Sequence, residues 1–560
     1  MEKIDQLLLS VYTKDKADYI KKNIQELWQK YKVSASPEIL PISHKDVVLI
    51  TYADQLYKKG ENRLQTLHRF LNKYLNKEIS IVHLLPFYPF TSDDGFSVSN
   101  YYDVDPENGT WKDIDALSKD YNLLFDAVIN HSSKKMDWFT KFLAGDEKYK
   151  GFYKVVDSTE GYENVTRPRT SPLTHSYLSA NGAVNVWTTF SEDQVDLNFE
   201  DPDLLIQVLD VLLFYISKGA SIIRLDAVGF IWKEKNTTCM HLPQTHALVK
   251  LMRLVVNHIN PSALLLSETN VPHQDNISYF GQGDEANMVY NFTLPPLLAF
   301  SLLNANTDKL KKWFLDIKVP FKNVCYFNFL ASHDGIGVMP VVDRLNENEL
   351  NSLIKAATAN GGRVSYKSNG KGSKIPYEIN SNYLSLLCGE NQDESLGIKR
   401  SLLAHAVLLS MPGLPAIYFH SIIGSLNDIK GMEESGINRR INREKLEFNQ
   451  LEKQLEDTNS RRAHILQSIK KLINIRAKEP SFDPYGDYEL LDTDKGVFAI
   501  LRKGVNNQNN ISCFYNFTQE DKIIDFNDDD SYVDIISNKK YMDAIIIKPL
   551  SFIWLKLITQ

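Results

Sequence analysis

The sequence lacks the features of several large classes of protein. No apolar run reaches the roughly 18 residues that a membrane-spanning helix needs, and the N-terminus has no long apolar core with a small-residue cleavage site. The 4 cysteines lie far apart and form neither a CxxC pair nor a metal-ligand spacing. We therefore expect a reduced, cytoplasmic protein with no membrane partner and no metal site.

An excess of positive charge is also missing. The chain has 63 Lys and Arg residues against 70 Asp and Glu residues, which gives a net charge of −7. Proteins that bind nucleic acid are usually basic, so we expect no nucleic-acid partner. A hydrophobic share of 43% excludes wholesale disorder, and 560 residues are enough for about two or three domains.

Short apolar segments recur along the chain, and most are followed by a longer helical pattern. Such alternation predicts an α/β protein, and a count of eight strands favours a (β/α)8 TIM barrel. A doubly wound parallel sheet is the alternative. The strands are expected at residues 47–52, 80–87, 122–131, 221–230, 263–270, 288–292, 324–335 and 415–419.

The segments around and between these strands differ in pattern. Residues 1–45 look helical and amphipathic, and residues 485–560 read as a small all-β C-terminal domain, so the barrel would span 46–484. Two intervals are too long for simple crossovers. They lie after the third and the seventh strand, at about 132–190 and 336–400, and are expected to form inserted subdomains.

Three acidic residues and one arginine stand where apolar strands end. Arg224 and Asp226 follow SII, Glu268 follows ALLLS, and Asp334 follows NFLASH. The carboxyl ends of barrel strands meet at one mouth, so these side chains should lie together. Retaining cleavage of a glycosidic bond needs one carboxylate that attacks and one carboxylic acid that protonates the leaving group. A purely structural Arg–Asp pair is the alternative for the first segment.

The same segments resemble the signatures of the α-amylase superfamily, glycoside hydrolase family 13. DAVINH at 126–131 resembles its first signature, RLD at 224–226 the second, Glu268 the third and HD at 333–334 the fourth. Three further stretches are similar to its sucrose-phosphorylase subfamily: HLLPFYPFTSDDGFSV (83–98), VTRPRTSPLT (165–174) and GINRRINREK (436–445). Among the members of that subfamily, LITYADQ (49–55) and NFLASHDGIG (328–337) are most similar to those that act on glucosylglycerate.

The resemblance implies a role for each acid. Asp226 would be the nucleophile that forms a β-glucosyl ester, and Arg224 would help to keep it ionised. Glu268 would be the acid/base, with a pKa raised by burial. Asp334 would stabilise the transition state. A catalytically inert barrel is the alternative from another functional class, but such chains are expected to lose the nucleophile or the acid.

Further residues around the glucosyl group follow from the resemblance. Asp93 and Arg439 would pair to close the far end of a site for one glucose, whereas Asp126 and Asn130 would support the mouth rather than act in catalysis. For an aromatic such as Phe96, plain packing under a loop is the alternative. The expected substrate-binding residues are Asp93, Phe96, His131, Gln194, Arg224, His333, Glu378 and Arg439.

Phosphate would be the distinguishing ligand. Arg169 matches a phosphate contact of the subfamily, and Arg167 lies beside it; a planar guanidinium suits an oxyanion. A surface arginine pair is the alternative. Glu378 stands where sucrose phosphorylase has a glutamine that contacts the acceptor, and this departure disfavours fructose as the partner sugar.

An anionic acceptor such as glycerate would need a cation close by. By position alone, Arg440, Lys371 and Lys374 are the candidates, the last two in a Gly/Ser/Lys-rich stretch at 360–374 that predicts a flexible loop.

The expected activity is thus that of a retaining phosphorylase without a cofactor. It would convert 2-O-α-D-glucosyl-D-glycerate and inorganic phosphate to α-D-glucose 1-phosphate and D-glycerate. The alternatives are phosphorolysis of sucrose, sucrose 6'-phosphate or glucosylglycerol, and hydrolysis of an α-glucoside by the same residues. The subfamily is often dimeric, so a homodimer is also expected, although no isolated apolar helix indicates its interface.

Overall fold

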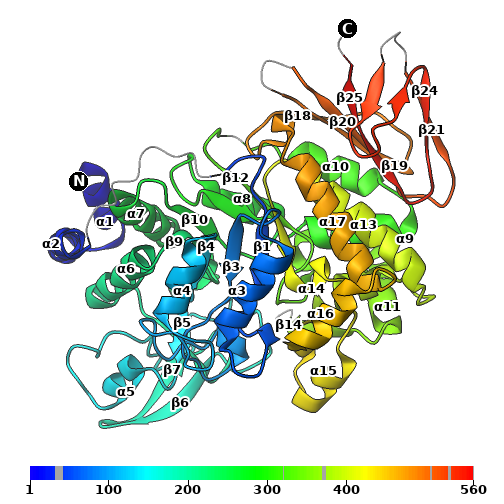
Figure 1. Cartoon of the computed structure of the whole chain (residues 1–560). Helices are drawn as coiled ribbons and strands as arrows, with labels where there is room; N and C mark the ends of the chain where they lie inside the picture. The colour runs from blue at the N-terminus through cyan, green and yellow to red at the C-terminus, as the bar shows by residue number, and fades with distance from the viewer. Residues whose placement is uncertain (32–41, 320, 369–373, 505–507, 527–530, 559–560) are drawn as a thin grey trace.

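A closed barrel of eight parallel strands forms the centre of the computed structural model (Figure 1). The structure describes residues 1–560 except 32–41, 320, 369–373, 505–507, 527–530 and 559–560. The barrel strands are β1 (Val48–Thr51), β3 (Ile81–Leu84), β4 (Asn122–Ala127), β9 (Ala220–Leu225), β10 (Leu264–Ser267), β11 (Met288–Tyr290), β12 (Cys325–Phe329) and β16 (Leu414–Tyr418). Each overlaps a strand expected from the sequence, and β16 pairs with β1, which closes the barrel and rules out an open doubly wound sheet.

The strands are buried because helices cover the outside of the barrel. β1, β3 and β10 are buried at all four positions, as near-continuous apolar runs of parallel strands should be. The covering helices include α3 (Arg63–Tyr74), α6 (Pro202–Ser217), α7 (Pro243–Ile259), α13 (Glu394–Ser410) and α17 (Arg461–Arg476). In α6, the Asp201 side chain caps the backbone N–H groups of Asp203 and Leu204.

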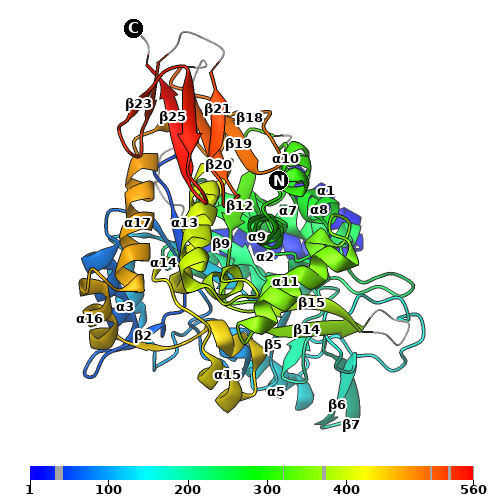
Figure 2. The same ribbon diagram turned by 90° about the vertical axis from the view of Figure 1, so that its right-hand side faces the viewer.

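Two insertions extend the barrel at the carboxyl ends of its strands. The first follows β4 and holds β5 (His131–Ser133), α5 (Asp137–Leu143), β6 (Thr174–Ser179), β7 (Gly182–Trp187) and β8 (Gln194–Asp196). The second follows β12 and holds β13 (Ile336–Gly337), α11 (Glu347–Ala359), β14 (Arg363–Ser368) and β15 (Lys374–Asn380). In both Figure 1 and Figure 2 the two insertions lie at the same end of the barrel.

The described part of the stretch at 360–374 is not a plain loop. Arg363–Ser368 and Lys374–Asn380 pair as an antiparallel hairpin, with an irregularity between Ser365 and Tyr366. Pairing with β13 extends the hairpin to a three-stranded sheet. The β-prone Val364 and Tyr366 therefore outweigh the neighbouring glycines and serines in this part of the chain.

The two ends of the chain add smaller units. α1 (Glu2–Val11) and α2 (Lys14–Lys30) pack on α7 and α6, where Lys30 pairs with the buried Asp210 at 2.6 Å. The C-terminal part forms a six-stranded sheet, as expected for an all-β domain. Its strands, in spatial order, are β18 (Tyr488–Leu490), β19 (Val497–Arg502), β20 (Ile511–Asn516), β25 (Phe552–Leu557), β22 (Tyr532–Asp534) and β23 (Lys540–Tyr541). Among the described residues, no helix is long and apolar enough to cross a membrane.

Candidate active site

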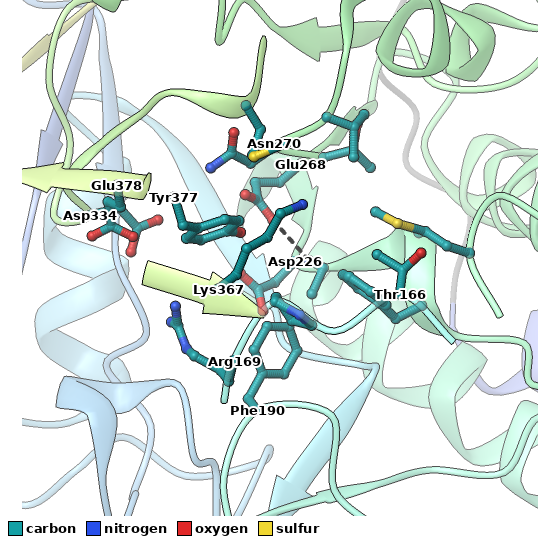
Figure 3. Close-up of a pocket in the computed structure, with 18 of the residues that line it drawn as sticks. Thr166, Arg169, Phe190, Asp226, Glu268, Asn270, Asp334, Lys367, Tyr377 and Glu378 are labelled. Carbon is teal, nitrogen blue, oxygen red and sulfur yellow. Dashed lines mark hydrogen bonds between the residues drawn. The ribbon is translucent and has the colours of Figure 1, made fainter. Parts of the chain in front are cut away.

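A cavity of about 480 Å³ opens at the carboxyl ends of the barrel strands, between the two insertions. Asp226 follows β9, Glu268 follows β10 and Asp334 follows the end of β12, and all three line this cavity (Figure 3). The sequence therefore placed the three acids at one mouth correctly. The other predicted residues that line it are Asp93, Phe96, His131, Arg167, Arg169, Gln194, His333, Glu378 and Arg439.

Arg224 lies beneath the cavity and joins the acids. Its Nη1 lies 2.9 Å from Oδ1 of Asp226 and also binds Asp126, and its Nη2 lies 3.9 Å from Oε2 of Glu268. The guanidinium is only 2% exposed and lies between the rings of Phe96 and Tyr290. One buried cation is thus shared by three carboxyl groups, which it holds in fixed positions.

The pKa values of Asp226 and Glu268 reflect this arrangement. Burial raises the pKa of Asp226 and Arg224 opposes it, so the net direction is opposite to that expected from Arg224 alone. Burial also raises the pKa of Glu268, as the sequence analysis expected. The Arg224 contact is shorter to Asp226 than to Glu268, so we assign the negative charge to Asp226 and the retained proton to Glu268.

The backbone beside Asp226 has an unusual conformation. Ala227 adopts a left-handed φ of 48°, and its N–H donates to Oε2 of Glu268 at 3.0 Å. A left-handed alanine costs about 1–2 kcal/mol, and such strain gathers at functional sites where the surroundings impose it. The turn after β9 therefore orients one acid and anchors the other.

Asp334 lies against two arginines from a single short segment. Nη1 of Arg439 is 2.5 Å from Oδ1 of Asp334, and Nη2 of Arg443 is 3.8 Å from the same atom. Burial opposes ionisation of Asp334, but these two guanidinium groups outweigh it and lower its pKa. Asp334 therefore stays charged at neutral pH.

The expected pairing of Asp93 with Arg439 is not what the structure shows. Arg443 lies 3.7 Å from Asp93 and 2.7 Å from Asp94, whereas Arg439 binds Asp334 and Glu378. Both arginines lie in or directly after the 3-10 helix η5 (Asn438–Asn442), whose turns send successive side chains in different directions. Arg443 is thus a site residue that the sequence analysis missed.

The aromatic and imidazole side chains form one wall of the cavity. Phe96 stacks on His333 with ring centroids 4.6 Å apart, so it packs and faces the cavity at the same time. Nε2 of His131 donates to the Phe96 carbonyl at 2.9 Å, and Gln194 donates to the same carbonyl at 3.1 Å. Burial lowers the pKa of His131 and of His333, so both rings are neutral.

Asp126 and Asn130 lie behind this wall and do not line the cavity. Asp126 is fully buried and binds Arg224 together with His83, at 2.8 Å from Nε2 of the histidine. Asn130 donates to Asp196 at 3.1 Å and accepts from Lys233 at 3.0 Å. Their contacts are those of supporting residues.

The two arginines expected to bind phosphate reach the cavity from the first insertion. The Arg169 guanidinium lies 5.9 Å from the centre of the Phe190 ring and 6.0 Å from that of Tyr377. Arg167 donates to the Ser171 carbonyl, while its buried Nε has no hydrogen-bond partner among the residues described. Within the described part of the chain, neither arginine forms an ion pair, so both are available to an anion.

Of the three cations proposed for an anionic acceptor, the two that the structure describes, Arg440 and Lys374, do not line the cavity. Arg440 binds Asp94, Lys374 is exposed on β15, and Lys371 is outside the described residues. Instead, Lys367 of β14 lines the cavity. The alternation of side chains along a strand could have indicated Lys367, but only if residues 363–368 had been predicted as a strand. Other lining residues that it missed are Tyr377, Asn270 and Phe190.

The described residues hold no group of three His, Cys, Asp or Glu side chains arranged for a metal ion.

Comparison with known proteins agrees with this geometry. Residues 72–365 match the family model of the α-amylase catalytic domain. A glucosylglycerate phosphorylase from Spirochaeta thermophila is 46% identical over 477 residues, which cover 85% of this chain and 81% of that protein. A glucosylglycerate phosphorylase from Escherichia coli is 41% identical over 513 residues, which cover 91% of this chain and 92% of that protein.

The solved structure of sucrose 6F-phosphate phosphorylase from Thermoanaerobacter thermosaccharolyticum has the same fold. It aligns with a TM-score of 0.74 at 24% identity and covers 90% of this chain and 98% of its own. The catalytic-domain match includes Asp226, Glu268 and Asp334, and the relatives match along most of their length. The chain therefore belongs to the α-amylase family, glycoside hydrolase family 13.

Proposed function

We propose that the protein is a retaining phosphorylase that transfers the glucosyl group of 2-O-α-D-glucosyl-D-glycerate to inorganic phosphate. The observation that carries the proposal is the division of charge in the cavity. Asp226 and Glu268 lie together above Arg224, and the unpaired Arg169 lines the same space. Carboxyls for glycosyl transfer and a free cation for an oxyanion are the two things that phosphorolysis needs.

In the first step, an Asp226 oxygen attacks the anomeric carbon of the glucosyl group. The glycosidic carbon–oxygen bond breaks, and Glu268 gives its proton to the departing glycerate oxygen. The product is a β-glucosyl ester of Asp226. The raised pKa of Glu268 keeps this proton in place until it is needed, and the charged Asp334 stabilises the positive charge that develops on the sugar ring.

In the second step, a phosphate oxygen attacks the same carbon from the face that glycerate left. The ester bond breaks, its electron pair returns to the Asp226 carboxylate, and Glu268 takes the proton of the attacking phosphate. Two inversions give α-D-glucose 1-phosphate. Arg169, with Arg167 nearby, would hold the phosphate for this attack.

Two observations favour glycerate over fructose as the partner. The relatives with 41% and 46% identity carry the name glucosylglycerate phosphorylase, whereas a sucrose phosphorylase from Streptococcus mutans is 28% identical. In addition, Glu378 is 1% exposed and its carboxylate is bound to Arg439. It therefore does not offer fructose the contact that the glutamine at this position makes with the acceptor in sucrose phosphorylase.

The test separates phosphorolysis from hydrolysis, which would use the same acids. The purified protein is incubated with glucosylglycerate, with and without phosphate, and glucose and glucose 1-phosphate are both quantified. In the reverse direction, glucose 1-phosphate is supplied with D-glycerate, glycerol, fructose or fructose 6-phosphate. We expect glucose 1-phosphate from the first assay and the fastest phosphate release with D-glycerate in the second. Free glucose formed equally with and without phosphate would contradict the proposal.

A further inference from the structure

The charged groups that line the cavity are not evenly compensated. Carboxylates of the inner part pair with Arg224, Arg439 or Arg443; these are Asp93, Asp226, Glu268, Asp334 and Glu378. The remaining lining acid, Asp275, is exposed. By contrast, Arg167, Arg169 and Lys367 line the cavity without an ion pair to any described residue.

Lys367 differs from the two arginines in its origin. It stands on β14 of the second insertion, where it pairs with Ile375 of β15, whereas Arg167 and Arg169 come from the first insertion. Its Nζ lies 6.0 Å from the centre of the Tyr377 ring, and Figure 3 shows its side chain crossing the cavity, with Tyr377 and Arg169 to one side and Thr166 to the other.

Lys367 is partly buried and has no counter-charge among the described residues. Partial burial lowers its pKa, and within the described residues no carboxylate or hydrogen-bond acceptor offsets the loss of water. Loss of hydration without a partner is unfavourable, so a charged ammonium in a substrate cavity is best explained by an anion that arrives with the substrate.

We infer that Lys367 binds the carboxylate of the acceptor and thereby selects an anionic acceptor over a neutral one. The inference rests on the proposed function and deepens it. Two anions occupy the cavity in turn during that reaction, the glycerate carboxylate and phosphate. The planar guanidinium of Arg169 suits the phosphate. The single, flexible ammonium of Lys367, which comes from the opposite insertion, suits the smaller carboxylate.

The test compares acceptors that differ only in charge. Lys367→Met removes the ammonium and keeps an unbranched side chain, and glucosyl transfer from glucose 1-phosphate is measured with D-glycerate and with glycerol. We expect the KM for D-glycerate to rise about 10- to 100-fold, as for loss of one hydrogen bond to a charged group. The KM for glycerol and the hydrolysis of glucose 1-phosphate should change far less, and Lys367→Arg should retain part of the preference.

Lys374→Met is the matched control, because Lys374 lies on the same hairpin, is exposed and does not line the cavity. It should leave every KM unchanged. An equal rise for D-glycerate and glycerol in Lys367→Met, or a rise for phosphate alone, would overturn the inference.

A second measurement distinguishes this inference from the proposed function. D-glycerate is titrated into the wild-type protein and into Lys367→Met by calorimetry, without turnover. If no acceptor is glucosylated by the wild-type protein, the proposed function fails. Loss of D-glycerate binding in Lys367→Met would still support the role of Lys367, and equal binding to both proteins would overturn it.

Discussion

Arg439 holds Glu378 through two parallel hydrogen bonds, from Nε to Oε1 at 3.0 Å and from Nη2 to Oε2 at 2.8 Å. The same guanidinium reaches Asp334, and Oε1 of Glu378 also accepts the backbone N–H of Gly335 at 2.7 Å. Glu378 stands on β15 of the second insertion, so this contact ties the insertion to the loop after β12. Glu378 therefore acts on the site through Arg439.

Loss of this charge should weaken the fold locally. We expect Glu378→Gln to lower the free energy of unfolding by about 1.5–3 kcal/mol, because a buried guanidinium loses an ionised partner. Chemical denaturation measures the change. Glu434→Gln is the control, since Glu434 forms an exposed pair with Lys430 at 3.7 Å, and it should cost less than about 0.5 kcal/mol. Equal effects of the two substitutions would show that the Arg439 contact has no special weight.

Asp226→Ala should lower phosphorolysis by at least about 10³-fold with the fold intact, because no other group can form the covalent ester. The circular dichroism spectrum checks the fold. Azide offered with α-glucosyl fluoride should give β-glucosyl azide in this variant, since a single inversion replaces two. More than trace formation of glucose 1-phosphate would refute the covalent mechanism.

The proton on Glu268 predicts the pH dependence of the rate. Burial raises the pKa of Glu268, and only the protonated form can assist departure of glycerate, so kcat/KM should fall as pH rises through the raised pKa. With α-glucosyl fluoride, whose leaving group needs no proton, the alkaline decline should be absent from the wild-type protein as well as from Glu268→Gln. A decline that persists in Glu268→Gln would assign it to another group.

The same shift predicts a stability effect. A carboxyl whose folded-state pKa is raised contributes stability below its unfolded-state pKa, and that contribution is lost as pH rises through the folded-state pKa. Glu268→Gln should therefore be more stable than the wild-type protein at neutral pH, and the difference should vanish in acid. Thermal denaturation at pH 4 and pH 7 measures it. An identical difference at both values would rule out titration of Glu268 as the cause.

Arg169→Ala should raise the KM for phosphate about 10- to 100-fold, since the guanidinium forms no ion pair with any residue that the structure describes and is free for the anion. With α-glucosyl fluoride as the donor, transfer of glucose to water should not change, because this route involves no phosphate. If both activities fall by the same factor, Arg169 has a structural role.

The position of the acids could be predicted because it depends on local pattern. Asp226, Glu268 and Asp334 each follow an apolar strand, and parallel strands of one barrel present their carboxyl ends together. The choice between Arg439, Arg440 and Arg443 could not be predicted in this way. All three lie within five residues, and only the turn of η5 decides which acid each one contacts. Arg439 contacts Glu378, Arg440 contacts Asp94 and Arg443 contacts Asp93.

The sequence by itself determined the barrel, its two insertions and the acids at its mouth, because periodicity and strand ends are properties of neighbouring residues. The tertiary structure alone decided which cations stay unpaired. Lys367 lines the cavity because the pairing of β14 with β15 places it there. The pKa of Asp226 rises because burial outweighs the adjacent Arg224. Pairing and burial sum contributions from segments far apart in the chain, which no local pattern contains.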